Sequence, residues 1–235
     1  MKKTLLLAAF AFAGAFAYAQ KPGAGDKTAE VSFTGAGLNS FNYNAPELRF
    51  RYFLADNMAV RARLSLGSTS STDKETVNTG GTEVNVERKT GSGFNLGISP
   101  GIEMHFAGTD KLSPYAGASL NIGLGGGATI EYTNATGGAP GAWTGVAKDN
   151  KATTKKGSTF GLGITMLMGA DYYITDGVFV GGEFGLGLFN MTSTGEGETT
   201  TKVSGVETKG KSATNSTFDL FGMMPSGGVR LGFKF

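Results

Sequence analysis

The residues that could do chemistry are charged side chains placed at every second position of apolar segments. Arg49 and Arg51, for example, alternate with Leu48, Phe50 and Tyr52. Period-two alternation puts the charges on one face of a strand and the apolar residues on the other. Charges that face the interior of a closed sheet must pair, because an unpaired buried charge costs several kcal/mol. We therefore predict a charge network in the lumen, formed by Glu47, Arg49, Arg51, Arg61, Arg63, Glu103, Asp171, Glu183, Arg230 and Lys234.

Such a network admits two interpretations. In the first, the network only fills the lumen and links the strands to one another, because eight strands enclose a space that side chains can fill. In the second, it lines a gated narrow pore or a proton path. The arginines lie on adjacent strands close to one turn, and we expect them to pair mainly with Glu47, Glu103 and Glu183.

No other constellation predicts a catalytic, cofactor or metal site. His105 is the only histidine, and we expect it at a strand end beside a short turn, as a rim residue and not a catalytic base. Glu196 and Glu198 are too few for a metal cluster. The glycines from Gly123 to Gly127 lack the Lys-Ser/Thr and the helix of a phosphate loop. The absence of cysteine excludes disulfides and thiolate metal sites.

The chain begins with the three parts of a secretory signal peptide. Lys2 and Lys3 precede an apolar run that ends in Ala17-Tyr18-Ala19, an A-x-A cleavage site. We expect residues 1–19 to be cleaved and residues 20–235 to form one domain. Removal of the two lysines leaves 19 basic against 19 acidic residues, and no basic stripe predicts nucleic acid as a partner.

The elements that position the charges are eight alternating segments. No apolar stretch after the signal reaches the roughly 18 residues of a spanning helix, so a membrane protein of this composition must close a sheet. Several segments have the 9–11 residues that a tilted membrane strand needs. We expect kinks at Gly125–Gly127 and between Phe221 and Gly228. The segments are 29–38, 45–54, 58–68, 92–106, 114–132, 158–174, 178–193 and 216–235.

The connections between these segments alternate in length. Residues 55–57, 107–113 and 175–177 form short turns, whereas 69–90, 133–156 and 194–215 are long and polar. This layout is typical of outer-membrane barrels, whose periplasmic turns are short and whose extracellular loops are long. The fold class predicted is all-β, a closed antiparallel up-and-down transmembrane β-barrel of eight strands.

The two faces of the segments differ in size as well as polarity. Large apolar residues occupy one face, and glycine, small polar residues and the charges occupy the other, so the apolar face should contact outer membrane lipid. Aromatic residues near strand ends, among them Tyr52, Tyr115, Tyr173 and Phe235, should form girdles at the membrane surfaces. A soluble lipocalin-like barrel, with its apolar residues inside, is the alternative fold.

The last strand supplies the one specific motif. Val229, Leu231, Phe233 and Phe235 alternate with polar or small residues up to the terminal aromatic residue. This stretch resembles the C-terminal assembly signal of outer-membrane barrels. The chain from residue 20 resembles the small OmpA/OmpX-like outer membrane β-barrel family, in versions common in Bacteroidota. The resemblance implies recognition by the barrel assembly machinery and a place in the Gram-negative outer membrane after export.

Two of the long loops also alternate. Residues 82–89 and 199–211 continue the pattern beyond the expected membrane span and could form a protruding sheet. An exposed sheet edge can recruit a protein partner by strand addition. The leading hypothesis is a non-enzymatic envelope protein with a structural or adhesive role and a plugged lumen. A porin-like channel for small solutes or ions is the alternative, and a lipid A-modifying enzyme ranks third.

Overall fold

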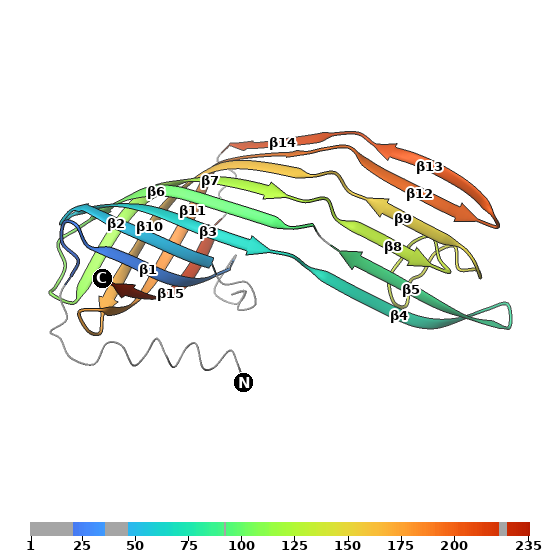
Figure 1. The fold of residues 1–235 in the computed structure, drawn as a ribbon, viewed down its shortest axis with the longest axis horizontal. Helices are drawn as coiled ribbons and strands as arrows, with labels where there is room; N and C mark the ends of the chain where they lie inside the picture. The colour runs from blue at the N-terminus through green and yellow to red at the C-terminus, as the bar shows by residue number, and fades with distance from the viewer. Residues whose placement is uncertain (1–20, 36–46, 92, 221–224) are drawn as a thin grey trace.

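The structure consists of a barrel that continues, on one side, into a second sheet (Figure 1). This computed structural model describes residues 21–35, 47–91, 93–220 and 225–235. All regular elements within these ranges are β-strands, and none of the described residues forms a helix long and apolar enough to cross a membrane. The predicted signal peptide, residues 1–19, lies outside the described residues.

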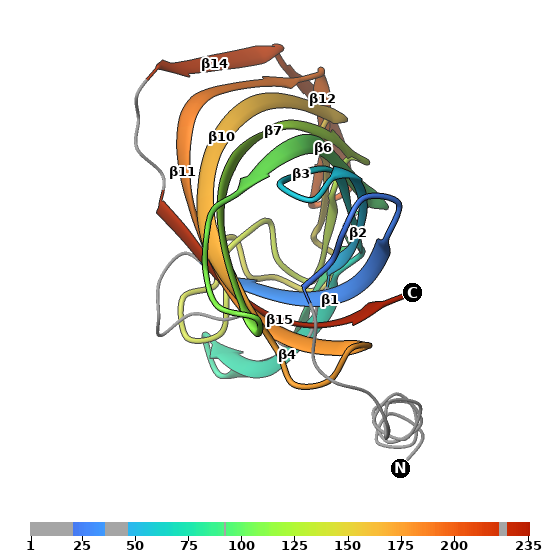
Figure 2. The ribbon, with the colours of Figure 1, turned by 90° about the vertical axis from the view of Figure 1, so that its left-hand side faces the viewer.

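Antiparallel pairing closes the barrel. β1 pairs with β2 on one side and with β15 on the other, and β10 pairs with β11, so these pairings close a circle (Figure 2). β14 and β15 both pair with β11 and together make its neighbour on that side, the eighth strand. The predicted eight-stranded barrel is confirmed. Its strands are β1 (Lys27–Gly35), β2 (Glu47–Ala55), β3 (Met58–Gly67), β6 (Asn95–His105), β7 (Leu112–Gly125), β10 (Thr159–Tyr173), β11 (Val178–Thr194), β14 (Asn215–Leu220) and β15 (Pro225–Lys234).

Alternation along these strands sorts the side chains by polarity. On β2, Phe50 is 50% exposed whereas Arg49 is 1% exposed, and on β6 Ile102 is 44% exposed whereas Glu103 is fully buried. The outer surface is therefore apolar and the interior polar, which is the arrangement of a barrel in lipid. The lipocalin-like alternative is wrong, because it requires the reverse arrangement.

Short connections gather at one end of the barrel. A two-residue turn, Asp56–Asn57, joins β2 to β3, and short segments join β6 to β7 and β10 to β11. In outer-membrane barrels this end is periplasmic, and the opposite end, with the long connections, is extracellular. The expected segments correspond to these elements, except that segment 114–132 contains β7 and a second strand, Thr129–Thr133, and that segment 216–235 contains β14 and β15. Residues 36–38, 45–46, 92 and 221–224 of the expected segments lie outside the described residues.

The three long connections, predicted as polar loops, instead contain three hairpins. These hairpins form a second antiparallel sheet, referred to below as the protruding sheet. Its order is β13-β12-β9-β8-β5-β4. The expected extension of residues 82–89 and 199–211 into strands is confirmed. The strands are β4 (Ser70–Thr79), β5 (Thr82–Gly91), β8 (Thr129–Thr133), β9 (Lys151–Lys155), β12 (Gly197–Val203) and β13 (Val206–Ser212).

A line of glycines separates the protruding sheet from the barrel. The strands are interrupted at 68–69, 93–94, 126–128, 156–158, 195–196 and 213–214. A Cβ atom on Gly127 would collide with the carbonyl oxygen of Lys156, and one on Gly157 with that of Gly195. The backbones approach this closely only because side chains are missing. We refer to this line, marked by Gly93, Gly126, Gly127, Gly157 and Gly195, as the glycine crease.

The segment between β8 and β9, residues 134–150, covers part of the protruding sheet. Val84 and Val86 of β5 form a small buried core with Ala135, and Trp143 packs against it. Glu75 of β4 accepts hydrogen bonds from the amide of Gly141 (2.8 Å) and from the indole of Trp143. These contacts fix the segment to the sheet.

Candidate functional site

Every strand of the barrel contributes to one polar cluster in its interior. Alternation turns these side chains inward, and the pairing register brings them to a common level. We call this group the lumen cluster. Its members are Glu30 on β1, Arg49 and Arg51 on β2, Arg61 on β3, Glu103 on β6, Tyr115 on β7, Asp171 on β10, Glu183 on β11 and Arg230 on β15.

Glu183 is one of two centres in the lumen cluster. Its carboxylate lies 2.8 Å from Arg49 Nη2, 2.7 Å from Arg61 Nη1 and 3.1 Å from Arg230 Nη1. The Tyr115 hydroxyl donates a further hydrogen bond of 2.7 Å. Three guanidinium groups thus share one carboxylate, which ties four strands together across the lumen.

Arg51 is the second centre. Its guanidinium lies 2.7 Å from Asp171 Oδ2, 3.1 Å from Glu103 Oε2 and 2.5 Å from Glu30 Oε1. Asp171 and Glu30 also pair with Arg230. Four guanidinium groups therefore meet four carboxylates, and the balance of charge makes their burial tolerable.

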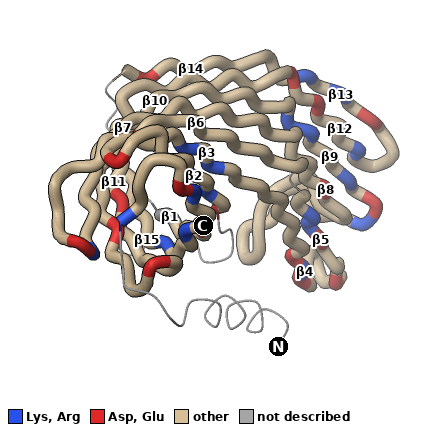
Figure 3. Tube along the Cα trace, turned by 60° about the vertical axis from the view of Figure 1, so that its left-hand side comes forward, with Lys and Arg blue, Asp and Glu red and all other residues tan. Residues whose placement is uncertain are grey.

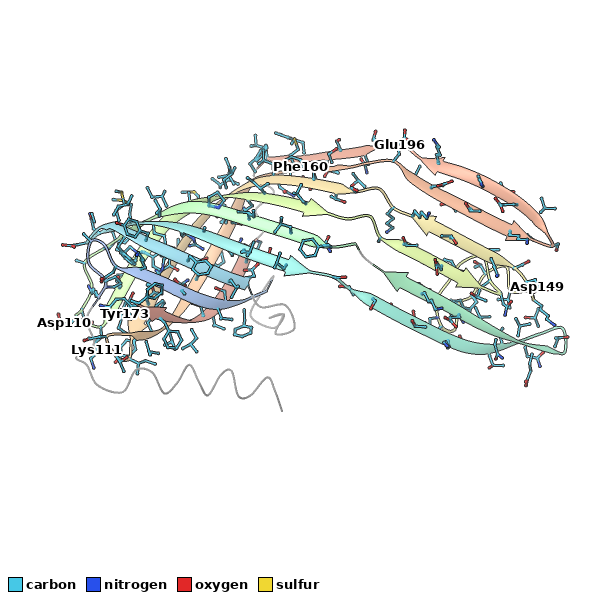
Figure 4. The ribbon with its side chains drawn as sticks, viewed as in Figure 1. Asp110, Lys111, Asp149, Phe160, Tyr173 and Glu196 are labelled. Carbon is cyan, nitrogen blue, oxygen red and sulfur yellow. The ribbon has the colours of Figure 1, made fainter. Side chains whose placement is uncertain are left out.

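An aromatic layer lies next to the arginines at the periplasmic end. The Arg51 guanidinium lies 5.1 Å from the ring centre of Phe179 and 5.7 Å from that of Phe53, within cation–π range. Tyr173 packs on Phe179, and Figure 4 shows Tyr173 at the end of the barrel that carries Asp110 and Lys111. Tyr115 and Tyr173 are 2% and 0% exposed, so their expected place in an outer girdle is wrong: their positions in the alternation turn them inward.

Three of the ten predicted network residues lie apart from the lumen cluster. Arg63 pairs with Glu47 at 3.4 Å, and both are partly exposed on the extracellular side of the cluster. Lys234 lies 3.7 Å from Asp26 at the periplasmic end, because it is the last residue of β15. The structure brings the other seven together: Arg49, Arg51, Arg61, Glu103, Asp171, Glu183 and Arg230.

Sequence reasoning missed Glu30 and Tyr115. Glu30 stands between Ala29 and Val31, so the alternation of the first segment already turned it toward the charged face. The alternation is weakest in that segment, and Glu30 was therefore not recognised as a residue that faces the lumen. Tyr115 alternates with Ala116, and the same parity placed it inward.

His105 lies in the wall near the periplasmic rim. Its Nδ1 is 2.9 Å from the Ser113 hydroxyl, and its Nε2 is 3.4 Å from Glu103. The order Ser–His–Glu resembles a nucleophile relay, but Ser113 is only 3% exposed and Glu103 is bound by Arg51 and Arg61. The arrangement therefore fixes the edge of the lumen cluster. Among the described residues no group of His, Asp and Glu is placed to hold a metal.

Above the cluster the lumen widens. A cavity of about 650 Å³ at the extracellular end is lined largely by small residues, including Ser65, Gly97, Gly123 and Thr159. Below it, a cavity of about 20 Å³ lies between Arg49, Arg63 and Glu183, which is room for about one water molecule. The lumen thus has a wide extracellular vestibule and a cluster of charged side chains beneath it.

The protruding sheet carries its charge unevenly (Figure 3). Strands β4, β5 and β8 hold five acidic and three basic residues, net −2, whereas β9, β12 and β13 hold five lysines and two glutamates, net +3. The hydrogen bonds from Gly141 and Trp143 lower the pKa of Glu75. The ammonium groups of Lys89 and Lys74 lower the pKa of Glu87. The two halves of the sheet therefore have opposite sign.

Solved structures of other proteins match this chain over most of its length, at low sequence identity. The N-terminal β-barrel domain of OprF from Pseudomonas aeruginosa is 16% identical, with a TM-score of 0.39, over 91% of this chain and 100% of that one. OprG from the same organism is 14% identical, with a TM-score of 0.40, over 92% and 99%. Ail of Yersinia pestis is 9% identical, with a TM-score of 0.35, over 90% and 99%. No curated protein matches the sequence.

A family match covers most of the chain. The family is described as "Putative OmpA-OmpF-like porin family", and the match extends over residues 38–235. This range includes seven of the eight barrel strands and the whole protruding sheet. The chain therefore belongs to the OmpA-OmpF-like porin family of outer-membrane β-barrels.

Proposed function

We propose that this outer-membrane barrel acts through its protruding sheet, which binds other polypeptide chains by adding a strand. The observation that carries the proposal is the pair of edges. Among the described residues β4 pairs only with β5, and β13 only with β12. Unpaired amides and carbonyls of an edge strand are a template for a further strand. On the extracellular side they face the partners that an envelope protein meets.

The lumen cluster supports a non-conducting barrel. Its arginines and acids come from both sides of the lumen, and its four arginines, Arg49, Arg51, Arg61 and Arg230, are at most 5% exposed. Ion pairs across the interior would have to break for a solute to pass, and breaking a buried pair costs several kcal/mol. In this proposal the barrel is an anchor and the cluster holds it closed.

Photo-crosslinking in intact cells tests the proposal. A photo-reactive amino acid is placed at Thr76 on β4 or at Lys209 on β13, both exposed edge positions, and at Thr153 on β9, in the middle of the sheet, as the matched control. We expect protein adducts from the two edge positions and none from residue 153. Adducts at residue 153 equal to those at the edges, or no adducts at all, would contradict strand addition.

A narrow channel is the second candidate, and the vestibule favours it. A cavity of about 650 Å³ open at the extracellular end could collect small solutes, and the family carries the word porin in its description. Reconstitution of the folded protein in planar bilayers separates the two functions. Reproducible conductance steps would establish the channel. Their absence would favour the protruding sheet as the functional element.

A further inference from the structure

The two edges of the protruding sheet fit each other. We infer that copies of this chain join side by side in the membrane, with β13 of one copy paired to β4 of the next. This inference rests on the proposed function, since it names the partner of the same edges. The strands lie at opposite margins of the sheet (Figure 1), so each copy can offer one edge to each of two neighbours.

Chain direction favours the pairing of unlike edges. β4 follows β3 and runs away from the barrel, whereas β13 leads into β14 and runs back toward it. Copies in one membrane share their orientation, so β13 of one copy and β4 of another are antiparallel. Two β4 edges, or two β13 edges, would have to pair in parallel. Every strand pairing among the described residues is antiparallel, and antiparallel ladders are the more stable kind.

The distribution of charge also favours the pairing of β13 with β4. β4 carries Asp73 and Glu75 against one lysine, whereas β13 carries Lys209 and Lys211 against one glutamate. Behind each edge the half-sheet has the same sign as its edge strand. Unlike edges therefore attract and like edges repel, which gives specificity more than raw affinity.

The hairpin turns fix which residues are free to pair. Gly80–Gly81 and Ser204–Gly205 are two-residue turns with positive φ, as type I′ hairpins require. Residues that flank such a turn bond within the hairpin, and bonded positions then alternate along the strand. The amides of Lys74 on β4 and of Glu207 and Lys209 on β13 consequently point away from the sheet.

One register satisfies these charges. Glu207 opposite Lys74 of the next copy makes an ion pair and leaves Lys209 opposite Thr72. A shift by two residues in one direction sets Lys209 against Lys74 and creates a like-charge contact, and a shift in the other direction makes no ion pair. In the favoured register Thr208 lies beside Asp73 of the neighbour, in a non-hydrogen-bonded position where Cα atoms are about 4.5 Å apart.

Neither edge has the features that usually prevent such pairing. Both strands lack proline, and both pair with their inner neighbour without a bulge. Lysines alone could blunt an edge, but here the lysines of one edge meet a strand of opposite net charge. A head-to-tail contact of this kind produces rows or rings of copies.

Cysteine pairs test the register directly, because the chain has no native cysteine. The variant with Asp73→Cys and Thr208→Cys is oxidised in outer-membrane preparations that hold the full-length protein. Such close Cα atoms lie within disulfide range. We expect a ladder of dimers, trimers and larger species that collapses on reduction. The pair Ser71→Cys and Thr208→Cys, shifted by two residues, should stay monomeric, as should each single variant.

Charge reversal supplies the second arm. Lys74→Glu should reduce the ladder of the D73C/T208C protein several-fold, and adding Glu207→Lys should restore it. Heat-modifiable gel mobility identifies any variant whose barrel has not folded. A folded D73C/T208C protein that remains monomeric after oxidation would contradict the pairing between copies. If photo-adducts at residues 76 and 209 then contain other proteins, the proposed function stands, and if no adducts form, it falls as well.

Discussion

At the scale of the single residue, Glu183 is the acid on which the lumen cluster depends most. Three arginines and Tyr115 direct donors at its carboxylate. Glu183→Ala would leave buried guanidinium groups with too few partners. We expect a loss of about 3–5 kcal/mol in the free energy of unfolding, the range measured when one partner of a buried pair is removed. Urea titration of the protein folded in lipid vesicles measures it.

A matched substitution on the protruding sheet provides the control. Glu131 lies on β8 and is exposed, so Glu131→Ala should change the same free energy by no more than about 0.5 kcal/mol. A similar small change for Glu183→Ala would mean that Arg49, Arg61 and Arg230 find water or other acids in its absence.

Glu75 makes the protruding sheet sensitive to acid. Hydrogen bonds from Gly141 and Trp143 lower its pKa in the folded protein. A depressed pKa contributes stability that is present above the ordinary carboxyl value of about 4.3 and is lost as the pH falls through the folded value. Trp143 is the only tryptophan. Its fluorescence should therefore stay constant from pH 7 to about pH 5 and shift to the red in stronger acid.

Two variants separate this effect from general acid unfolding. Glu75→Gln removes the titrating group, so the red shift should already be partly present at neutral pH and should change little on acidification. Glu131→Gln should keep the wild-type response. An unchanged acid transition in Glu75→Gln would show that another group controls the segment 134–150.

Sequence alone predicted seven members of the lumen cluster, because alternation is a property of single strands. Arg49 and Glu183 needed only their neighbours along the chain to be assigned inward. Which acid meets which arginine depends on register and barrel stagger, and these are set by all eight strands together. That is why Arg63 and Glu47 form a separate pair although they have the same pattern.

At the scale of the element, two alanine substitutions test the close backbone approach at the glycine crease. Gly127 lies in the crease, and Gly123, four residues earlier, is the matched control. A Cβ at Gly127 would meet the backbone of Lys156, whereas one at Gly123 would meet nothing within 4 Å. Gly127→Ala should therefore force β8 and β9 apart, at a cost of about 1–3 kcal/mol typical of overpacking. Gly123→Ala should be close to neutral.

Amide hydrogen exchange tests this prediction in the two strands that should separate, β8 and β9. Faster exchange should appear in β8 and β9 of Gly127→Ala, with the barrel strands unchanged. Equal exchange in the two alanine variants would mean that the crease accommodates a methyl group by a small shift of the backbone.

The barrel strands were predictable, whereas β4 and β9 of the protruding sheet were not. A barrel strand such as β10 alternates large apolar residues with glycine, and the contrast is visible in one sequence. A strand such as β4 is polar on both faces, with Ser, Thr, Asp, Lys and Glu in succession. Its pairing is stabilised by backbone hydrogen bonds and by neighbours far along the chain, so its own residues carry little signal.

At the scale of the whole molecule, the vestibule and the lumen cluster make a prediction about conduction. The cavity of about 20 Å³ lies where Arg49 meets Glu183, directly below the vestibule. Removing both side chains, Arg49→Ala with Glu183→Ala, deletes one positive and one negative charge, so the net charge of the cluster is unchanged. Arg61 keeps Glu103, and Arg230 keeps Asp171 and Glu30. The barrel should therefore fold with a wider passage at this level.

In planar bilayers we expect no conductance steps from the wild-type protein and discrete steps from this double variant. The control removes the pair above the cluster, Arg63→Ala with Glu47→Ala, which is partly exposed and should leave the bilayer silent. Steps from the wild type would favour the channel over the anchor. A silent double variant would place the barrier lower, at the aromatic layer of Phe53, Tyr173 and Phe179, whose side chains are almost completely buried beneath the arginines. Substitution of Phe179 by alanine in the double variant would then have to open the path.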